Sequence, residues 1–283
     1  MGALAVAEIA RQAGLHARVG GVTWERRPID PLPGPRRLDE IEDAEPLNDA
    51  VVLAHPDTRG PGGFRFAESH MARHLGEPVA LVDPHPGPVA LAAAIDDAAR
   101  RLGCDFVALV DVGGDVLGHG YEAGLASPLC DAVLLATAAH MALPSVGAIF
   151  GPGCDGELTP DEVLARVAEV AAAGGLLGAQ GIGQAELPHL EAAAREVPTE
   201  ASASALRCAR GAYGRAEIRD GRRTVPLSPL GAVTFFFDPR SAIASAARCA
   251  AAVVDAPSLL DADRILAERG VRTELGWERE QAG

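Results

Sequence analysis

Aromatic residues are scarce in this 283-residue chain, and lysine is absent. Phe, Trp and Tyr make up 4% of the residues, whereas apolar residues as a whole make up 48%. Ala, Val and Leu must therefore build the hydrophobic core, which favours helices packed closely on a sheet. Every basic side chain is an arginine or a histidine, so the sequence excludes lysine Schiff-base chemistry and a phosphate-binding loop with its lysine.

The sequence also lacks a basic surface and a long apolar run. Its net charge is −14, and binding to a phosphate backbone needs a basic surface, so we expect no nucleic-acid partner. No segment approaches the roughly 18 apolar residues of a membrane span, and the start has no charged region before a signal-like stretch. We expect a soluble cytoplasmic protein with no membrane partner.

Paired cysteines are missing as well. None of the five cysteines forms a Cys-x-x-Cys pair, so neither a zinc ribbon nor a disulfide framework is indicated. Their number is odd and their spacing wide, and we expect reduced thiols. They stand at positions 104, 130, 154, 208 and 249.

Strands and helices alternate over residues 1–180. The apolar strand at 106–110 does not alternate, which is typical of parallel strands covered on both faces. The alternation predicts a doubly wound, mostly parallel Rossmann-like sheet in an α/β fold. The expected strands are 17–24, 50–54, 79–82, 106–110 and 145–150; the expected helices are 3–11, 66–75, 88–102, 127–140 and one from 159; residues 26–46 are expected to form a loop.

The pattern of helices, a hairpin and a strand over residues 181–283 predicts a C-terminal α+β extension packed on the same core. The alternative is a single domain over 1–283. The Ala-rich helices at 238–254 and 258–269 are candidates for the interface of a homo-oligomer. The other expected elements are helices at 185–196 and 201–212, a strand at 233–237, and a hairpin of strands 215–218 and 224–227 with a type I′ turn at Asp220-Gly221.

The beginning of the chain reads as a helix. Doubly wound domains usually place a strand and a glycine-rich turn before their first helix. Residues 3–11 already have helical spacing, with Gly14 as a natural end. We therefore expect the first strand and its glycine-rich turn to be missing, and a start further upstream in the natural reading frame.

The segment Asp111-Val112-Gly113-Gly114-Asp115 follows a buried strand. Ligands in open α/β sheets bind beyond the carboxyl ends of strands, and Gly113 and Gly114 let a cofactor approach the backbone. Asp111 and Asp115 are predicted ligands of Mg²⁺, which prefers oxygen and often bridges to phosphate. The alternative is that the two aspartates accept hydrogen bonds from backbone N–H groups and only shape the turn.

The chain continues as Gly118-His119-Gly120-Tyr121-Glu122. His119 and Glu122 are predicted catalytic residues that would move protons together with Asp115, and the alternative is a solvated or structural role for each. Ser127 is predicted to cap the helix that begins at Pro128. A nucleophilic role for Ser127 is disfavoured because no Gly-x-Ser-x-Gly surrounds it.

A second glycine loop, residues 151–157, follows the strand at 145–150. If the two strands are neighbours, Asp155 joins the predicted metal ligands with Glu157 beside it, and Gly151 and Gly153 face the ligand. The alternative is a turn that leads into a capping box at Thr159.

Two weaker patterns point to ligands. His70 and His74 are four residues apart on a helix, but without the glutamate of His-Glu-x-x-His they are more typical of surface residues than of a zinc pair. Residues 178–183 are rich in glycine and precede a helix, where an anion could bind.

Three motifs together resemble an uncharacterised family, domain of unknown function 1152. They are Asp111-Val-Gly-Gly-Asp115, Glu122-Ala-Gly-Leu-Ala-Ser-Pro128 and Gly151-Pro-Gly-Cys-Asp-Gly-Glu-Leu158, and the resemblance covers nearly the whole chain. It implies the α/β fold and, ahead of the first helix, a strand with an Asp-containing glycine turn that this sequence lacks. It implies no activity.

Two hypotheses of function follow. The first is an enzyme that acts on a small anionic metabolite, phosphorylated or a nucleotide, by metal-assisted phosphoryl-type or hydrolytic chemistry with Mg²⁺. The second is a non-catalytic metabolite-binding or regulatory protein that uses the same crevice. Saturable binding without turnover would distinguish the second from the first.

Overall fold

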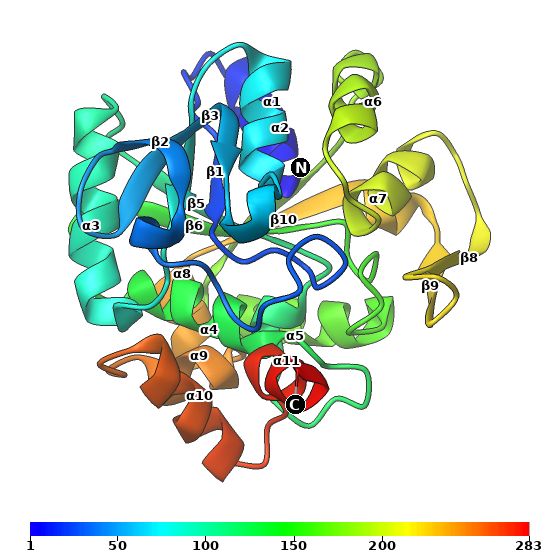
Figure 1. The fold of residues 1–283 in the computed structure, drawn as a ribbon. Coiled ribbons are helices and arrows are strands. Elements are labelled where there is room, and N and C mark those ends of the chain that lie inside the picture. The colour runs from blue at the N-terminus through cyan, green and yellow to red at the C-terminus, as the bar shows by residue number, and fades with distance from the viewer. Residues whose placement is uncertain (283) are drawn as a thin grey trace.

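The computed structural model describes residues 1–282, in which helices lie on both sides of the strands (Figure 1). The predicted Rossmann-like α/β class is confirmed. The strands are β1 (Gly20–Val22), β2 (Glu42–Pro46), β3 (Val51–Arg59), β4 (Val79–Val82), β5 (Val107–Val112), β6 (Ser145–Phe150), β7 (Leu176–Gly181), β8 (Gly214–Ile218), β9 (Arg223–Leu227) and β10 (Val233–Phe237).

The strands form two four-stranded sheets and a separate hairpin. The sheet orders are β1-β4-β3-β2 and β5-β6-β10-β7, and β8 pairs with β9. Both sheets are mixed: β1–β4 and β5–β6 run parallel, whereas β10 runs antiparallel to β6 and β7, and β3 antiparallel to β2 and β4. Because β5 and β6 are parallel neighbours, their carboxyl ends lie side by side at Val112 and Phe150.

The helices connect these strands and cover them. They are α1 (Gly2–Gln12), α2 (Ala67–Leu75), α3 (Gly87–Arg101), α4 (Pro128–Thr137), α5 (Pro160–Ala172), α6 (Leu187–Glu196), α7 (Ala201–Ala209), α8 (Pro239–Ala244), α9 (Arg248–Val253), α10 (Leu259–Glu268) and α11 (Glu274–Ala282). Short 3₁₀ turns are η1 (Leu38–Glu40), η2 (Pro61–Gly63), η3 (Asp115–Leu117) and η4 (Pro229–Ala232).

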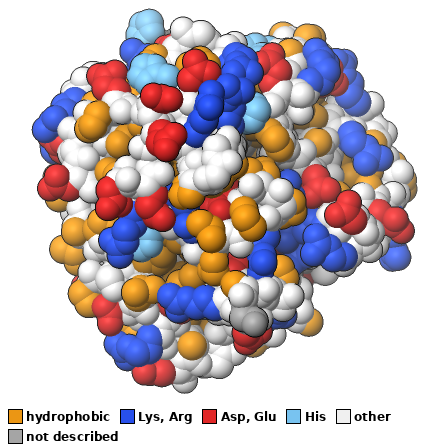
Figure 2. All heavy atoms as spheres, viewed as in Figure 1, with side chains coloured by type: hydrophobic (Ala, Val, Ile, Leu, Met, Phe, Trp, Pro, Cys, Tyr) orange, Lys and Arg blue, Asp and Glu red, His pale blue; other side chains and the backbone are white. Residues whose placement is uncertain are grey.

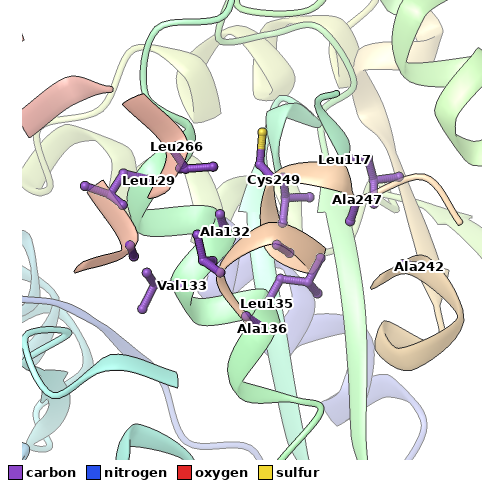
Figure 3. Packing of buried hydrophobic residues seen from close by; sticks show 14 of the residues in the cluster. Leu117, Leu129, Ala132, Val133, Leu135, Ala136, Ala242, Ala247, Cys249 and Leu266 are labelled. Atoms are coloured by element: carbon purple, nitrogen blue, oxygen red, sulfur yellow. The ribbon is translucent and has the colours of Figure 1, made fainter. Parts of the chain in front are cut away.

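The largest core cluster has α4 at its centre. Leu129, Val133 and Leu135 of α4 are fully enclosed, together with Leu266 of α10 and Cys249 of α9 (Figure 3). Burying one such leucine stabilises the fold by roughly 1.5–3 kcal/mol. The Ala-rich helices α8, α9 and α10 thus contribute residues to this core, and their role in a subunit interface stays a prediction.

Three expected elements differ from the structure, and one helix was not expected. Within the predicted loop at 26–46, Glu42–Pro46 is a charged edge strand, of the kind that discourages further pairing. Residues 176–181 are β7 rather than a loop before a helix. The single helix predicted at 238–254 is divided into α8 and α9. The chain bends between them at Ser245, whose hydroxyl donates a hydrogen bond to the carbonyl of Ser241. Helix α11 had no counterpart among the predicted elements.

The C-terminal part of the chain contributes to the central sheet. Strand β10 lies between β6 and β7, so residues beyond 180 are hydrogen-bonded within the sheet that carries β5 and β6. The division of the chain at residue 180 stays a prediction. Over residues 1–282, no helix is long and apolar enough to cross a lipid bilayer, and all five cysteines are free thiols.

Candidate functional site: a buried carboxylate cluster

Strand β5 ends in a closed turn built by one aspartate. Asp111 lies within the strand, which ends at Val112 rather than at the expected residue 110, and its Oδ2 accepts hydrogen bonds from the backbone N–H of Gly114 (2.7 Å) and Val116 (3.4 Å). Gly113 and Gly114 have φ of 124° and 113°, which side chains rarely allow. The turn carries the chain from β5 directly into η3 and places Asp115 next to Asp111.

Five carboxylates meet at this edge of the sheet. We call them the acidic cluster: Asp111, Asp115, Asp131, Asp155 and Glu157. They form two overlapping groups of three whose oxygens lie within 4.8 Å of one another, Asp111–Asp115–Asp131 and Asp115–Asp155–Glu157. Asp115 belongs to both groups. The structure thus brings together the three predicted metal ligands, and it adds Asp131.

Asp131 was missed by sequence reasoning. It lies in the first turn of α4, where an acidic residue is expected simply because it complements the helix dipole. Its position three residues after Pro128 gave no indication that it faces η3. Only the packing of α4 against η3 brings its carboxylate to Asp111 and Asp115.

The electrostatics of the acidic cluster are unfavourable without a cation. Burial raises the pKa of Asp111 to about 6. Burial and the charge of Asp111 raise the pKa of Asp115 and of Asp131 well above the ordinary range, and burial with the charge of Glu157 does the same to the pKa of Asp155. Burial is the largest cause of each shift, repulsion between the carboxylates adds to it, and a divalent cation would favour the ionised carboxylates against both.

Asp155 and Glu157 differ in how well they are satisfied. The Glu157 carboxylate accepts hydrogen bonds from the N–H of Ala126 (2.7 Å) and Ser127 (2.8 Å) and from the Ser127 hydroxyl (2.5 Å). Asp155 is 4% exposed, and within residues 1–282 its Oδ1 has no hydrogen-bond partner. A buried, unpartnered carboxylate oxygen is costly unless it carries a proton or contacts a cation.

The four glycines predicted to face a cofactor have protein atoms at the position where a Cβ would stand. A Cβ on Gly113 would lie 2.1 Å from Oδ1 of Asp155, and Cβ atoms on the other three would meet side chains at 2.8–3.0 Å: Gly114 against Val163, Gly151 against Ala205 and Gly153 against Pro160. These glycines let the two loops interlock, and Gly153 N–H donates to the carbonyl of Gly113 (2.7 Å). Gly151, Gly153 and Gly156 have the spacing Gly-x-Gly-x-x-Gly, but α5 begins only at Pro160.

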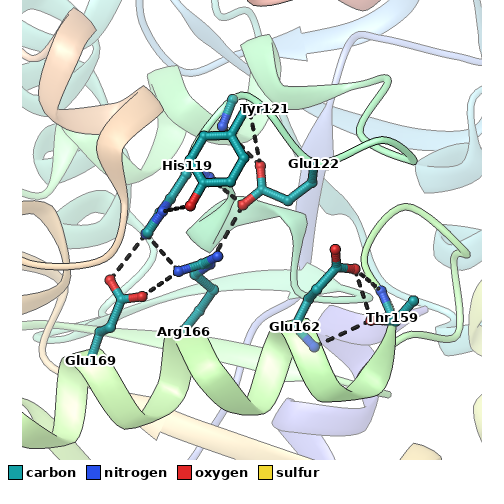
Figure 4. Close-up of polar contacts among 8 residues, drawn as sticks. His119, Tyr121, Glu122, Thr159, Glu162, Arg166 and Glu169 are labelled. Carbon is teal, nitrogen blue, oxygen red and sulfur yellow. Dashed lines mark hydrogen bonds and ion pairs between the residues drawn. The ribbon is translucent and has the colours of Figure 1, made fainter.

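His119 and Glu122 lie in a separate polar group. The His119 group consists of His119, Tyr121, Glu122, Arg166 and Glu169 (Figure 4). His119 Nε2 lies 3.0 Å from both Glu169 Oε2 and Arg166 Nη1, and its Nδ1 lies 2.9 Å from the Tyr121 hydroxyl. Arg166 also pairs with Glu169 and, at 3.5 Å, with Glu122. Among the described residues, no hydrogen bond joins this group to the acidic cluster.

In the His119 group, one arginine lies between two glutamates. Burial, followed by the positive charge of Arg166, lowers the pKa of His119. Burial acts to raise the pKa of Glu122, but backbone N–H donors and Arg166 outweigh it and hold the pKa below its ordinary value. Glu122 accepts from the N–H of His119 (2.8 Å) and Gly120 (2.9 Å) and so shapes the loop. The structure therefore brings Asp115 together with the metal ligands, but not with His119 or Glu122.

Other predicted residues have clear local roles. Thr159 forms the predicted capping box with Glu162. The Ser127 side chain binds Glu157 and makes no cap hydrogen bond, which corrects the predicted cap. His74 lies 3.2 Å from Glu196, and neither His70 nor His74 belongs to a metal-binding group among residues 1–282.

The fold and the site define an α/β protein with a buried carboxylate cluster where two parallel strands end. Residues 1–282 match a family described as "Protein of unknown function (DUF1152)", and the chain belongs to this family. Neither a search of curated proteins nor a search of solved structures gave a match.

Proposed function

We propose that the protein is an enzyme that acts on a small phosphorylated metabolite or nucleotide with a divalent cation, such as Mg²⁺, in the acidic cluster. The observation that carries this proposal is the buried Oδ1 of Asp155, which has no hydrogen-bond partner within residues 1–282. Asp155 belongs to one of the two carboxylate groups, and Asp115 belongs to both. An acidic protein that binds an anion at a carboxylate-rich site needs a cation between the two. A small anionic metabolite held through a cation therefore suits the site, and the net charge of −14 disfavours a nucleic acid.

The donor set fits a hard divalent cation. Carboxylate oxygens are the ligands that Mg²⁺ and Mn²⁺ prefer, whereas the described neighbours include no histidine or thiolate that would select zinc. Asp111, Asp115 and Asp131 would hold one ion, and Asp155 with Asp115 a second position. A bound cation supplies charge stabilisation for a transferring phosphoryl group or an activated water. Oδ1 of Asp155, which has no hydrogen-bond partner within residues 1–282, would be the oxygen that contacts the ion at the second position.

A non-catalytic metabolite-binding protein is the second candidate. The observation that favours it is the orientation of His119, which is engaged with Glu169 and Arg166 rather than with the acidic cluster. Proton transfer at the cluster would then depend on carboxylates alone. Both candidates use the same site and both depend on the cation.

We further propose that the protein works in the cytoplasm, where its five thiols would stay reduced. On the face drawn in Figure 2, acidic and basic side chains are interspersed with hydrophobic ones. We also propose that the protein forms a homo-oligomer. Its interface would use exposed side chains, because apolar residues of α9 and α10 are buried in the core.

A ligand screen tests the proposal. Wild type and Asp115→Asn would be heated with a panel of phosphorylated metabolites and nucleotides, each with and without Mg²⁺, and compounds that stabilise the wild type would be assayed for phosphate release. We expect Mg²⁺-dependent stabilisation of the wild type that Asp115→Asn abolishes. Turnover would support the enzyme, whereas saturable binding without turnover would support the non-catalytic metabolite-binding protein. Stabilisation that is equal with and without Mg²⁺, or equal in Asp115→Asn, would show the proposal to be wrong.

A further inference from the structure

The β8–β9 hairpin carries two arginines next to the acidic cluster. Its turn has the predicted type I′ conformation, with φ of 55° at Asp220 and 77° at Gly221, and Arg219 also has a positive φ of 54°. Arg219 immediately precedes these residues, and Arg223 is the first residue of β9. The tight turn therefore brings both arginines to one end of the hairpin, and the hairpin as a whole lies beside α7 in Figure 1.

Both guanidinium groups point at the same carboxylate without being hydrogen-bonded to it. Arg219 Nη2 and Arg223 Nη1 lie 3.6 and 3.5 Å from Oε1 of Glu157. That carboxylate already accepts its hydrogen bonds from Ala126 and Ser127. Within residues 1–282, the Arg219 side chain makes no hydrogen bond, and Arg223 makes one, at 3.5 Å, to the carbonyl of Asp155. Most donors of both groups thus remain available to a ligand.

The two arginines are also exposed enough to be reached. Their side chains are 30% and 17% exposed, whereas the side chain of Glu157 beneath them is fully buried. Within residues 1–282, Glu157 is the only carboxylate at ion-pair distance from either arginine, so one negative charge faces two guanidinium groups. Arg26, the third arginine nearby, is engaged by Glu200 at 2.7 Å.

We propose that Arg219 and Arg223 form the phosphoryl-binding site of this protein, next to the cation position at Asp115 and Asp155. Guanidinium groups match the oxygens of a phosphate in pairs, which ammonium groups do not. The ligand class is a phosphate or diphosphate ester whose oxygens contact the arginines on one side and the cation on the other. This inference rests on the proposed function, and it assigns phosphate recognition to the hairpin rather than to the glycine loops, whose space protein atoms fill.

Inorganic pyrophosphate is the probe, and its binding is measured by calorimetry with and without Mn²⁺. The variants are Arg219→Asn, which tolerates a positive φ, and Arg223→Gln. The matched control is Arg222→Gln, an exposed arginine of the same turn that does not contact Glu157. We expect both variants to weaken pyrophosphate binding at least about tenfold, and Arg222→Gln to bind like the wild type. Thermal unfolding confirms that each variant is folded.

Separate outcomes judge the two proposals. Pyrophosphate affinities of Arg219→Asn and Arg223→Gln equal to that of the wild type would overturn the arginine site, and so would an absence of binding to the wild type at millimolar pyrophosphate. Titration with Mn²⁺ alone tests the cation site. If Mn²⁺ fails to bind but both variants still lose pyrophosphate, the arginine site holds and the cation is wrong.

Discussion

The backbone of Gly113 lies directly against the carboxylate of Asp155, so that a Cβ on Gly113 would come within 2.1 Å of Oδ1. Gly113 also has a φ of 124°. We expect Gly113→Ala to displace Asp155 and to lower the affinity for Mn²⁺ at least about tenfold, with a loss of stability of about 1–3 kcal/mol from backbone strain. Calorimetric titration and urea unfolding measure the two effects.

Gly103→Ala is the control for strain alone, because Gly103 has a φ of 73° and a Cβ there would meet nothing within 4 Å. It should lose stability without losing Mn²⁺ affinity. Unchanged affinity in Gly113→Ala would mean that the position of Asp155 does not matter for the cation.

Asp155→Asn should stabilise the protein in the absence of metal. The substitution removes a buried carboxylate whose pKa is raised well above its usual range by burial and by Glu157. We expect the free energy of unfolding at pH 8 to rise by about 1–2 kcal/mol in the presence of EDTA, and Mn²⁺ to stabilise the variant less than the wild type. A variant that is less stable than wild type without metal would show that Asp155 serves the fold rather than a ligand.

Glu274 gives a pH dependence with a defined sign. It accepts hydrogen bonds from the N–H of Leu129 (3.0 Å) and Cys130 (2.7 Å) at the start of α4, and burial raises its pKa to about 7. Between pH 4.5 and pH 7, the folded protein therefore keeps the proton on Glu274, whereas the unfolded chain releases it with the ordinary pKa of 4.5. The stability from this proton is complete below pH 4.5 and is lost as the pH rises through 7.

Glu274→Gln removes that proton equilibrium. Between pH 5 and pH 8, the wild type should lose about 1–3 kcal/mol of unfolding free energy that Glu274→Gln does not lose. Urea denaturation at both pH values measures this difference. Glu280→Gln, an exposed position on the same helix, is the control and should track the wild type. A Glu274→Gln difference that stays constant with pH would refute the raised pKa.

Arg166 should matter for stability and not for the cation. Its side chain is 11% exposed and pairs with Glu122, whose side chain is 2% exposed. Arg166→Ala leaves that buried carboxylate without its cation, which costs about 3–5 kcal/mol, and should leave Mn²⁺ affinity within about threefold of wild type. The double variant Arg166→Ala with Glu122→Gln should recover much of the loss in urea unfolding. A large fall in Mn²⁺ affinity would instead connect the His119 group to the acidic cluster.

Part of the site was accessible from the sequence because it follows from strand order. An unbroken apolar strand before Asp111, and another before the loop that contains Asp155, indicated two loops at the same edge of a sheet. The pairing of β5 with β6 confirms that the two loops are adjacent, with Val112 opposite Phe150. Residues that follow parallel neighbouring strands converge, and sequence patterns detect such strands well.

The rest depended on packing that sequence patterns do not encode. Asp131 lies on a helix, where its acidic side chain needs no explanation beyond the dipole. His119 was expected at the cluster because it is close in sequence to Asp115, but η3 turns the chain so that His119 faces α5. Strand β10 inserts between β6 and β7 from far along the chain, and local periodicity gives no strand order. The charged strand β2 was mistaken for a loop because its pairing, not its composition, makes it a strand.

The most direct measurement for the central claim is a calorimetric Mn²⁺ titration of the wild type and of Asp115→Asn. Asp115 belongs to both carboxylate groups, so its loss should weaken Mn²⁺ binding more than about a hundredfold. Asp96→Asn is the control, because Asp96 is also buried but accepts hydrogen bonds from the N–H of Ala142 and Leu143, away from the cluster. We predict Mn²⁺ binding to wild type and Asp96→Asn and none to Asp115→Asn; equal affinities in wild type and Asp115→Asn would contradict a cation site in the acidic cluster.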